Sequence, residues 1–236
     1  MKVDLHIHTV LSPCGDIEMT PAAIVRSAVA AGVGVIGITD HNSTRQCAEI
    51  GRIGEREGVY VMCGAEITTR EEAHVLAFVD GDENVAKLQA FLDENLAKIP
   101  NRPDFFGYQL VVNEQEEVVY EEEILLISAI SKTVEQIEAF VHSLGGIFIP
   151  AHIDKPKDSL TSQLGFVPPH LNADAFELSP RCDKEAFLAQ HPYLKDKHFT
   201  RSSDAHYPEE LWRATMELDI EGKPDFEKVR EAIKKL

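Results

Sequence analysis

Residues 2–41 read KVDLHIHTVLSPCGDIEMTPAAIVRSAVAAGVGVIGITDH. Val3 and Leu5 alternate with polar residues in segment 2–6, and segment 33–39 is a β-branched run, which predicts two strands. Between them, residues 21–31 predict a helix, because Thr20 is a good N-cap and a proline follows it at the first helical position. A strand, a helix and a second strand in this order predict a right-handed βαβ unit with parallel strands.

The alternation of strand and helix continues along most of the chain. Further strands are predicted at residues 59–66, 73–79, 147–151, 173–178, 199–203 and 212–219, and further helices at 43–57, 84–99, 133–144 and 225–236. Residues 109–120 predict two short strands around a polar turn, within an insertion at about 82–130 that we expect to lie over the site. The acidic run 121–123 predicts the start of a solvated helix. About seven strands with intervening helices predict one α/β domain over residues 1–236, with a barrel-like architecture.

The overall charge limits the classes of partner. Lys and Arg total 23 and Asp and Glu total 40, which gives a formal net charge of −17. Such a surface repels a nucleic-acid backbone, so we expect no extended nucleic acid as a partner, although a local cationic site could hold a small phosphorylated substrate. For most of the surface the charge serves solubility.

Targeting and redox signals point to one compartment. Residues 1–6 lack the features of a signal peptide, and no apolar run approaches the ~20 residues of a membrane span. The four cysteines are scattered, which predicts a reducing, cytoplasmic location and no structural zinc knot. We expect Cys14 and Cys63, which fall near candidate site residues, to be small packing residues.

Histidines and acids recur at the edges of the predicted strands. The candidate metal ligands are His6, His8, His41, Glu66, His74, His152, Asp204 and His206. Imidazole and carboxylate are preferred ligands of divalent transition metals, and the carboxyl ends of barrel strands converge at one face. A single histidine here would as often be an ordinary hydrogen-bonding residue, but the whole set predicts a polynuclear metal site. Such sites usually catalyse hydrolysis.

Neighbouring residues predict supporting roles. Glu66 follows an apolar strand and would be buried, so it requires a partner such as a metal ion. Asp40 is expected to orient a ligand imidazole through its other ring nitrogen. Arg181 is the first candidate for binding a phosphate, ahead of other cations at Lys155, Lys157 and Arg70. The remaining histidines, His142, His170, His191 and His198, are interpreted as structural or surface residues.

Several of these motifs together resemble the PHP (polymerase and histidinol phosphatase) family. They are Asp4-Leu-His-Ile-His-Thr9, Pro21…Ala28…Gly32…Ile38-Thr-Asp-His41, Gly64-Ala-Glu66, His74, Ala151-His152 and Ser203-Asp-Ala-His206. The resemblance spans residues 2 to about 210. It implies a distorted seven-stranded (β/α)7 TIM-like barrel that holds two or three divalent ions, Mn, Fe or Zn, and hydrolyses phosphate esters such as histidinol phosphate, nucleoside bisphosphates or nucleic-acid ends.

The resemblance also implies how the ligands are shared. His6, His8, Glu66 and Asp204 would hold one ion, and Glu66 would bridge to a second ion held by His74 and His152. His41 and His206 would hold a third ion with an acid after the first strand. In relatives that acid stands in a Ser-Asp-Gly segment; here the segment is Ser12-Pro-Cys-Gly-Asp16, so Asp16 is the expected equivalent and Glu18 the alternative.

The expected activity is metal-dependent hydrolysis of a small phosphomonoester, with Glu66, Asp204 and Arg181 as the catalytic residues. A nucleoside bisphosphate or an oligonucleotide end is the first substrate expected, and histidinol phosphate is the second. Two other classes remain open at this stage. One is a metal-holding regulatory or interaction module without turnover, and the other is a C–N hydrolase of the amidohydrolase type, disfavoured because the bridging position is a glutamate rather than a lysine.

Overall fold

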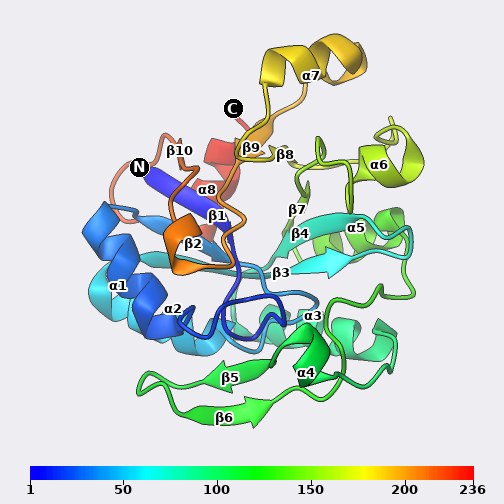
Figure 1. Cartoon of the computed structure of the whole chain (residues 1–236). Helices are drawn as coiled ribbons and strands as arrows, with labels where there is room; N and C mark the ends of the chain where they lie inside the picture. The colour runs from blue at the N-terminus through cyan, green and yellow to red at the C-terminus, as the bar shows by residue number, and fades with distance from the viewer.

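The computed structural model describes residues 1–236. Six strands form a curled, mixed sheet in the order β10-β1-β2-β3-β4-β7 (Figure 1). These strands are β1 (Lys2–Ile7), β2 (Val35–Ile38), β3 (Tyr60–Thr68), β4 (His74–Phe78), β7 (Ile147–Pro150) and β10 (Met216–Glu217). β1, β2 and β3 are mutually parallel, as the βαβ pattern of the first 41 residues predicts.

Two further strands complete a ring. β8 (Phe176–Leu178) and β9 (Phe199–Arg201) form a parallel pair of their own. The N–H of Ile153 donates to the carbonyl of Glu177 at 2.8 Å, which joins the end of β7 to β8. A parallel bridge between Ile7 and Ala205 joins the segment after β9 to β1. The ring consists of the seven strands β1, β2, β3, β4, β7, β8 and β9, with β10 paired to β1 outside it. The predicted distorted barrel is therefore confirmed.

The parallel strands that the alternation of strand and helix predicts are not found at the edge strand β10, which is antiparallel to β1, nor at β4. β4 is antiparallel to both of its neighbours, β3 and β7. The reason is the length of the connection, because residues 69–73 are far fewer than the dozen or so that a parallel crossover requires. β3 and β4 instead form a hairpin, in which Thr68 is the register partner of His74. The hairpin places the beginning of β4 at the same end of the barrel as the end of β3.

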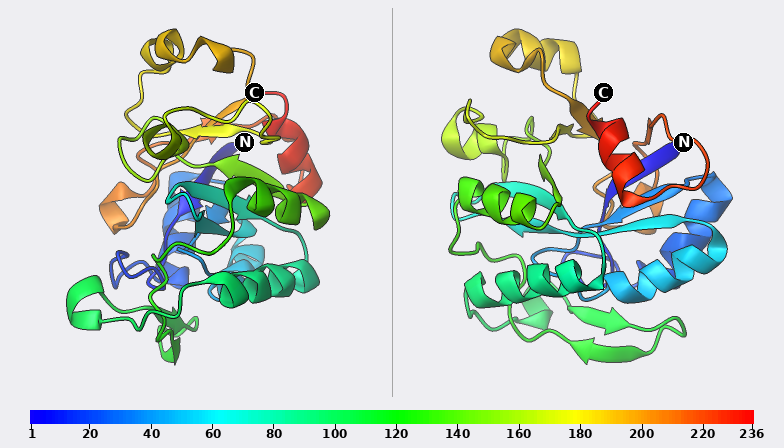
Figure 2. Two further views of the ribbon diagram at one scale, coloured as in Figure 1. Left: turned by 90° about the vertical axis from the view of Figure 1, so that its right-hand side faces the viewer. Right: turned by 180° about the vertical axis from the view of Figure 1, so that it is seen from behind.

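Helices cover the outside of the barrel, and Figure 2 shows α2, α3, α5 and α8 across its rear. The helices are α1 (Pro21–Ala31), α2 (Cys47–Glu57), α3 (Asp82–Asn95), α4 (Pro103–Phe106), α5 (Val134–Ser143), α6 (Leu160–Leu164), α7 (Lys184–Gln190) and α8 (Phe226–Ile233). The predicted cap of α1 is confirmed, since the Thr20 hydroxyl accepts a hydrogen bond from the Ala23 N–H at 3.2 Å. No helix is long and apolar enough to cross a membrane.

The middle of the chain departs most from expectation. The short strands β5 (Leu110–Val112) and β6 (Val118–Glu121) are present as an antiparallel hairpin. The helix expected to start at residues 121–123 is absent, because this segment stays extended and the Glu122 N–H donates to the Gln109 carbonyl at 2.8 Å. The hairpin packs beside the loop after β1, where Val10 forms a small buried cluster with Leu110 and Val112.

Three predicted strands are shorter than expected. The strands at 173–178 and 199–203 reduce to β8 and β9, and the strand at 212–219 reduces to β10. The extra residues of the second segment, Ser202 and Ser203, are buried and lead directly into Asp204. Short strands therefore leave irregular backbone at the edge of the barrel where the candidate ligands stand.

Candidate metal centre

Five imidazoles surround the carboxylate of Glu66. This side chain is 2% exposed and lies at the end of β3. Its Oε1 lies 2.9 Å from His74 Nδ1, 3.1 Å from His152 Nε2 and 3.4 Å from His6 Nε2. Its Oε2 lies 3.2 Å from His41 Nδ1 and 3.3 Å from His8 Nε2. The end of β3 thus places one acid at the centre of five histidines from four other segments.

A second carboxylate, Asp204, lies at the edge of this cluster. Its Oδ1 is 3.4 Å from His6 Nε2, 3.6 Å from His8 Nε2 and 3.7 Å from His206 Nδ1. The rings of His8 and His206 stack with their centroids 4.0 Å apart. Eight of the predicted ligands therefore come together in one place. Six of them form three overlapping groups that could each hold an ion: His8, His41 and His206; His6, His8 and Glu66; His41, Glu66 and His74.

The spacing of these atoms fits ligands that share metal ions. Ligand atoms that each lie about 2.1 Å from one ion are separated by about 3.0–3.5 Å. The Nε2 atoms of His6 and His8 face each other at 3.2 Å, close to that separation. His41 Nδ1 is buried beside Glu66 but has no hydrogen-bond partner. Buried nitrogen atoms that point at one another or lack partners are costly unless a cation satisfies them.

The charge balance of the cluster shifts the pKa values in opposite directions. Burial lowers the pKa of His6, but Glu177, Asp204 and Glu66 outweigh burial and raise it well above the ordinary value. Burial and the positive charge of His8 together lower the pKa of His206 to about 3 and hold that of His41 well below its usual range. Neutral imidazole is the form that binds a metal.

The two acids are held ionised by the same cluster. Burial raises the pKa of Glu66, but His74, His6 and the other imidazoles outweigh it and hold the pKa well below its usual range. The pKa of Asp204 is also lowered, because His6 and His8 outweigh the effect of burial. Both carboxylates are therefore available as anionic ligands at neutral pH.

Glu177 on β8 is a functional residue that the sequence reasoning missed. It is 1% exposed, and its Oε2 accepts hydrogen bonds from His6 Nδ1 at 2.9 Å and from the His152 N–H at 3.1 Å. The bond to Nδ1 leaves the Nε2 lone pair of His6 directed toward Glu66 and His8. The signal was available, since Glu177 is a single charge within the apolar segment 175–178 and a buried charge requires a partner.

Asp40 supports a ligand, but not by direct contact as predicted. The hydroxyl of Ser12 donates to Asp40 Oδ1 at 2.7 Å and lies 2.9 Å from His8 Nδ1. Since this hydroxyl has one proton and gives it to Asp40, it accepts from His8. Asp40 is itself fixed by the N–H and the hydroxyl of Thr9, at 2.7 and 2.8 Å. The prediction is thus corrected to an indirect role through Ser12.

Two candidate ligands have backbone conformations that residues other than glycine rarely adopt. His152 has φ of 29° and Asp204 has φ of 51°, both in the left-handed region. Arg213 holds the second of these turns, because its guanidinium donates to the carbonyl of Ser203 at 2.8 Å and to that of Asp204 at 3.2 Å. Strained backbone that is fixed in this way is typical of functional sites.

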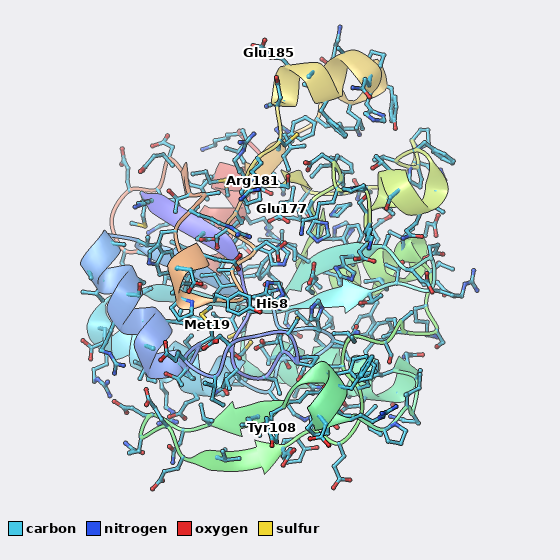
Figure 3. All side chains as sticks on the ribbon, in the orientation of Figure 1. His8, Met19, Tyr108, Glu177, Arg181 and Glu185 are labelled. Carbon is cyan, nitrogen blue, oxygen red and sulfur yellow. The ribbon has the colours of Figure 1, made fainter.

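Four other predicted site residues lie outside the cluster. Asp16 Oδ1 accepts from the Glu18 N–H at 2.8 Å in a local turn, and neither acid belongs to the three groups of ligand atoms. The backbone N–H of Asp16 donates to the His206 carbonyl, and this hydrogen bond holds the loop that contains Asp16 close to the site. Arg181 and Arg70 are exposed, and Figure 3 shows Arg181 beyond Glu177 on the side away from His8.

Of the candidate lysines and the remaining histidines, only Lys155 contacts the cluster. Lys157 is exposed, whereas Lys155 pairs with Asp204 Oδ2 at the edge of the cluster. The four histidines interpreted as structural or surface residues all lie elsewhere; for example, His142 pairs with Asp174 at 3.0 Å. Cys63 packs against a core cluster, as predicted, but Cys14 is exposed and does not.

A cavity of about 470 Å³ opens beside the cluster. His41 and His74 form its inner wall, and the segment 127–129 that follows the β5–β6 hairpin forms another side. Asn42 holds this segment in place, because its side-chain amide donates to the carbonyls of residues 126 and 128 at 2.6 and 2.9 Å. Glu72 and Asp158 line the cavity, and no Lys or Arg does.

Two solved structures share this fold. The lesion-specific endonuclease PfuEndoQ from Pyrococcus furiosus aligns with a TM-score of 0.67 at 20% identity, covering 100% of this chain and 56% of that chain. A Bifidobacterium adolescentis protein, provisionally described as a metal-dependent phosphoesterase, aligns with a TM-score of 0.65 at 20% identity, covering 98% of this chain and 95% of that chain. At this level of identity the likeness concerns the fold alone.

Sequence comparison identifies the family. An uncharacterized protein of Methanocaldococcus jannaschii is 37% identical over 90 residues, which are 35% of this chain. The match spans 53% of that relative, about half its length. The family profile of the PHP domain matches residues 4–163, which include six of the eight clustered residues. The chain belongs to the PHP domain family.

Proposed function

We propose that this protein is a metal-dependent phosphoesterase that hydrolyses a small phosphomonoester. The observation that carries the proposal is the position of Glu66, whose two carboxylate oxygens lie within 3.4 Å of nitrogen atoms from five histidines. Because imidazole nitrogens lie near both of its oxygens, Glu66 could help to hold two ions. The membership of this chain in the PHP domain family supports hydrolysis of a phosphate ester.

Bound divalent ions would supply an activated water as nucleophile and would neutralise charge on the phosphoryl oxygens. The protein holds the ligand side chains in place before the substrate binds. Glu177 and Ser12 fix the orientation of His6 and His8, and the strained turn at Asp204 presents its carboxylate to both. This preorganisation lowers the cost of assembling the charged centre.

A small substrate suits the molecule better than a polymer. The net charge of −17 opposes association with a nucleic-acid backbone. The cavity of about 470 Å³ beside His41 and His74 is within the size range of pockets for small ligands. A nucleoside bisphosphate or the end of an oligonucleotide remains our first proposal for the substrate.

Histidinol phosphate is a second candidate, favoured by one specific observation. Glu72 and Asp158 line the cavity, which has no Lys or Arg in its wall. Carboxylates attract a leaving group that carries an amine and repel one that carries a second phosphate. Turnover of an amine-bearing phosphomonoester beside a bisphosphate would separate the two substrate classes.

The test is phosphate release from a panel of phosphomonoesters by protein loaded with Mn²⁺, Fe²⁺ or Zn²⁺. Glu66→Ala is expected to lose both the bound metal and the activity, because no other residue contacts all five histidines. Glu83→Ala, which alters an exposed acid on α3, is the matched control and should retain both. Stoichiometric metal without release from any ester would favour a regulatory module and would contradict the proposal, as would full turnover by Glu66→Ala.

A further inference from the structure

One lysine touches the candidate metal centre. Lys155 Nζ forms an ion pair with Asp204 Oδ2. Arg213 contacts Asp204 only at its backbone carbonyl, and no other Lys or Arg forms an ion pair with the side chain of a clustered ligand. Asp204 is 7% exposed at its side chain, whereas Lys155 is 37% exposed. The ammonium group therefore reaches from the solvent side to the edge of the cluster.

The backbone of Lys155 is fixed on both sides. Its N–H donates to the carbonyl of His152 at 2.9 Å, which closes a tight turn on a candidate ligand. Its own carbonyl accepts from the hydroxyl of Ser159 at 2.7 Å, and Ser159 is the fully buried N-cap of α6. These hydrogen bonds restrict the positions that the side chain of Lys155 can reach, so the fold of the loop directs its ammonium group toward Asp204.

The two oxygens of Asp204 face different groups. Oδ1 faces His6 and His8 at 3.4 and 3.6 Å, whereas Oδ2 faces Lys155. The carboxylate of Asp204 thus lies between the ammonium group of Lys155 and the imidazoles of the cluster. An anion that approached ions held by His6, His8 and Asp204 would meet a positive charge there.

We propose that Lys155 binds a phosphoryl oxygen of the substrate and so performs the role that the sequence assigns to Arg181. The inference rests on the proposed function, because it places a phosphoryl group at the same centre. Arg181 is exposed and contacts none of the clustered residues, while Lys155 is already in contact with one. A lysine at this position binds phosphate as a point charge and tolerates substrates of different shape.

A purely structural role is the competing explanation. Lys155 could act only by orienting Asp204, in which case its loss would weaken metal binding and would leave the affinity of the metal-loaded protein for phosphate unchanged. A phosphate-binding role predicts that loss of Lys155 leaves metal binding unchanged and weakens the affinity of the metal-loaded protein for phosphate. Measuring metal content and phosphate affinity on the same variants therefore distinguishes them.

The experiment is calorimetric titration of inorganic phosphate into metal-loaded protein. Lys155→Met, which keeps the length of the side chain and removes its charge, is expected to weaken phosphate binding by about 10- to 100-fold, the range of one charge-assisted hydrogen bond. Lys155→Arg should bind within about threefold of the unmodified protein. Lys157→Met is the matched control, because it removes an exposed lysine two positions away, and it should leave the phosphate Kd unchanged. All three should retain full metal content.

Two results would overturn the inference: an unchanged phosphate Kd in Lys155→Met, or a loss of metal in that variant that fully accounts for its weaker binding. Absence of phosphate binding by the unmodified, metal-loaded protein would also overturn it. Failure of the proposed function is a separate outcome. Phosphate binding that depends on Lys155, without turnover of any ester, would support the lysine's role and would contradict the phosphoesterase proposal.

Discussion

Glu177 Oε2 lies 2.9 Å from Nδ1 of His6, and the same oxygen accepts the backbone N–H of His152. One carboxylate on β8 therefore supports two candidate ligands from β1 and from the turn after β7. Because the three segments are far apart in sequence, this contact ties the closing strands of the barrel to the metal centre. It also makes Glu177 a sensitive place to test the centre without altering a ligand.

We expect Glu177→Gln to reduce the affinity for the divalent metal by about 10- to 100-fold, the usual cost of altering a residue that orients a ligating histidine. The amide can still accept from His6 Nδ1, but it no longer supplies negative charge to the imidazole. Metal titration followed by calorimetry measures the change. Glu185→Gln, on the exposed helix α7, is the control. Equal affinities for both variants would show that Glu177 has no influence on the metal.

Ser12→Ala tests the link between Asp40 and His8. The variant loses the hydroxyl that donates to Asp40 at 2.7 Å and accepts from His8, so a buried carboxylate and a buried imidazole each lose a partner. The free energy of unfolding should fall by about 1–3 kcal/mol, and the metal affinity should fall with it. Urea denaturation measures the first and metal titration the second. Ser143→Ala, at an exposed helix end, should change neither; a fully stable Ser12→Ala protein that binds metal normally would rule out this link.

Metal binding should release protons and strengthen as the pH rises. The pKa of His6 is raised well above its ordinary value and that of His8 is also raised, in both cases because carboxylates outweigh the effect of burial. The raised pKa values favour the protonated form of these imidazoles in the metal-free protein, and a metal ion must displace these protons. A net release of protons should therefore accompany metal loading. Calorimetry in buffers of different ionisation enthalpy counts them, and an enthalpy that is independent of the buffer would be inconsistent with this charge state.

Two glycines should respond in opposite directions to alanine. A Cβ on Gly37 would lie 2.5 Å from the Leu5 carbonyl oxygen of the neighbouring strand, so Gly37→Ala must push β1 and β2 apart and should cost about 1–3 kcal/mol or more. A Cβ on Gly51, within α2, meets no atom within 4 Å, so Gly51→Ala should stabilise the fold by about 0.5–1 kcal/mol. Thermal unfolding of the two variants checks both signs. A stable Gly37→Ala protein would mean that the two strands are not packed as closely as the structure shows.

The ligand cluster could be predicted because strand ends converge in any barrel of this kind. His6 and Glu66 needed only the recognition of buried strands that end in ligand side chains. Glu177 could have been found by the same reasoning, applied to a charge inside an apolar segment rather than at its end. The reversed direction of β4 was also predictable, since residues 69–73 are too few for a crossover.

Other features depend on contacts between segments that are far apart in the sequence, so the local sequence does not predict them. The hydroxyl of Ser12 stands between Asp40 and His8 only because the loop after β1 folds back over the end of β2. The choice between Lys155 and Arg181 depends on which way two loops turn once their strands end. Residues 121–123 have the composition of a helix start but extend a strand, because tertiary hydrogen bonds outweigh local propensity.

The β3–β4 hairpin has a consequence for how the protein is made. A turn of a few residues joins the strands that carry Glu66 and His74, and contacts between residues so close in sequence form quickly. This pair can form only after residue 78 has been synthesised, and Asp204 and His206 follow much later in the chain. The growing chain can thus bring two of the clustered side chains together before the ring of strands closes.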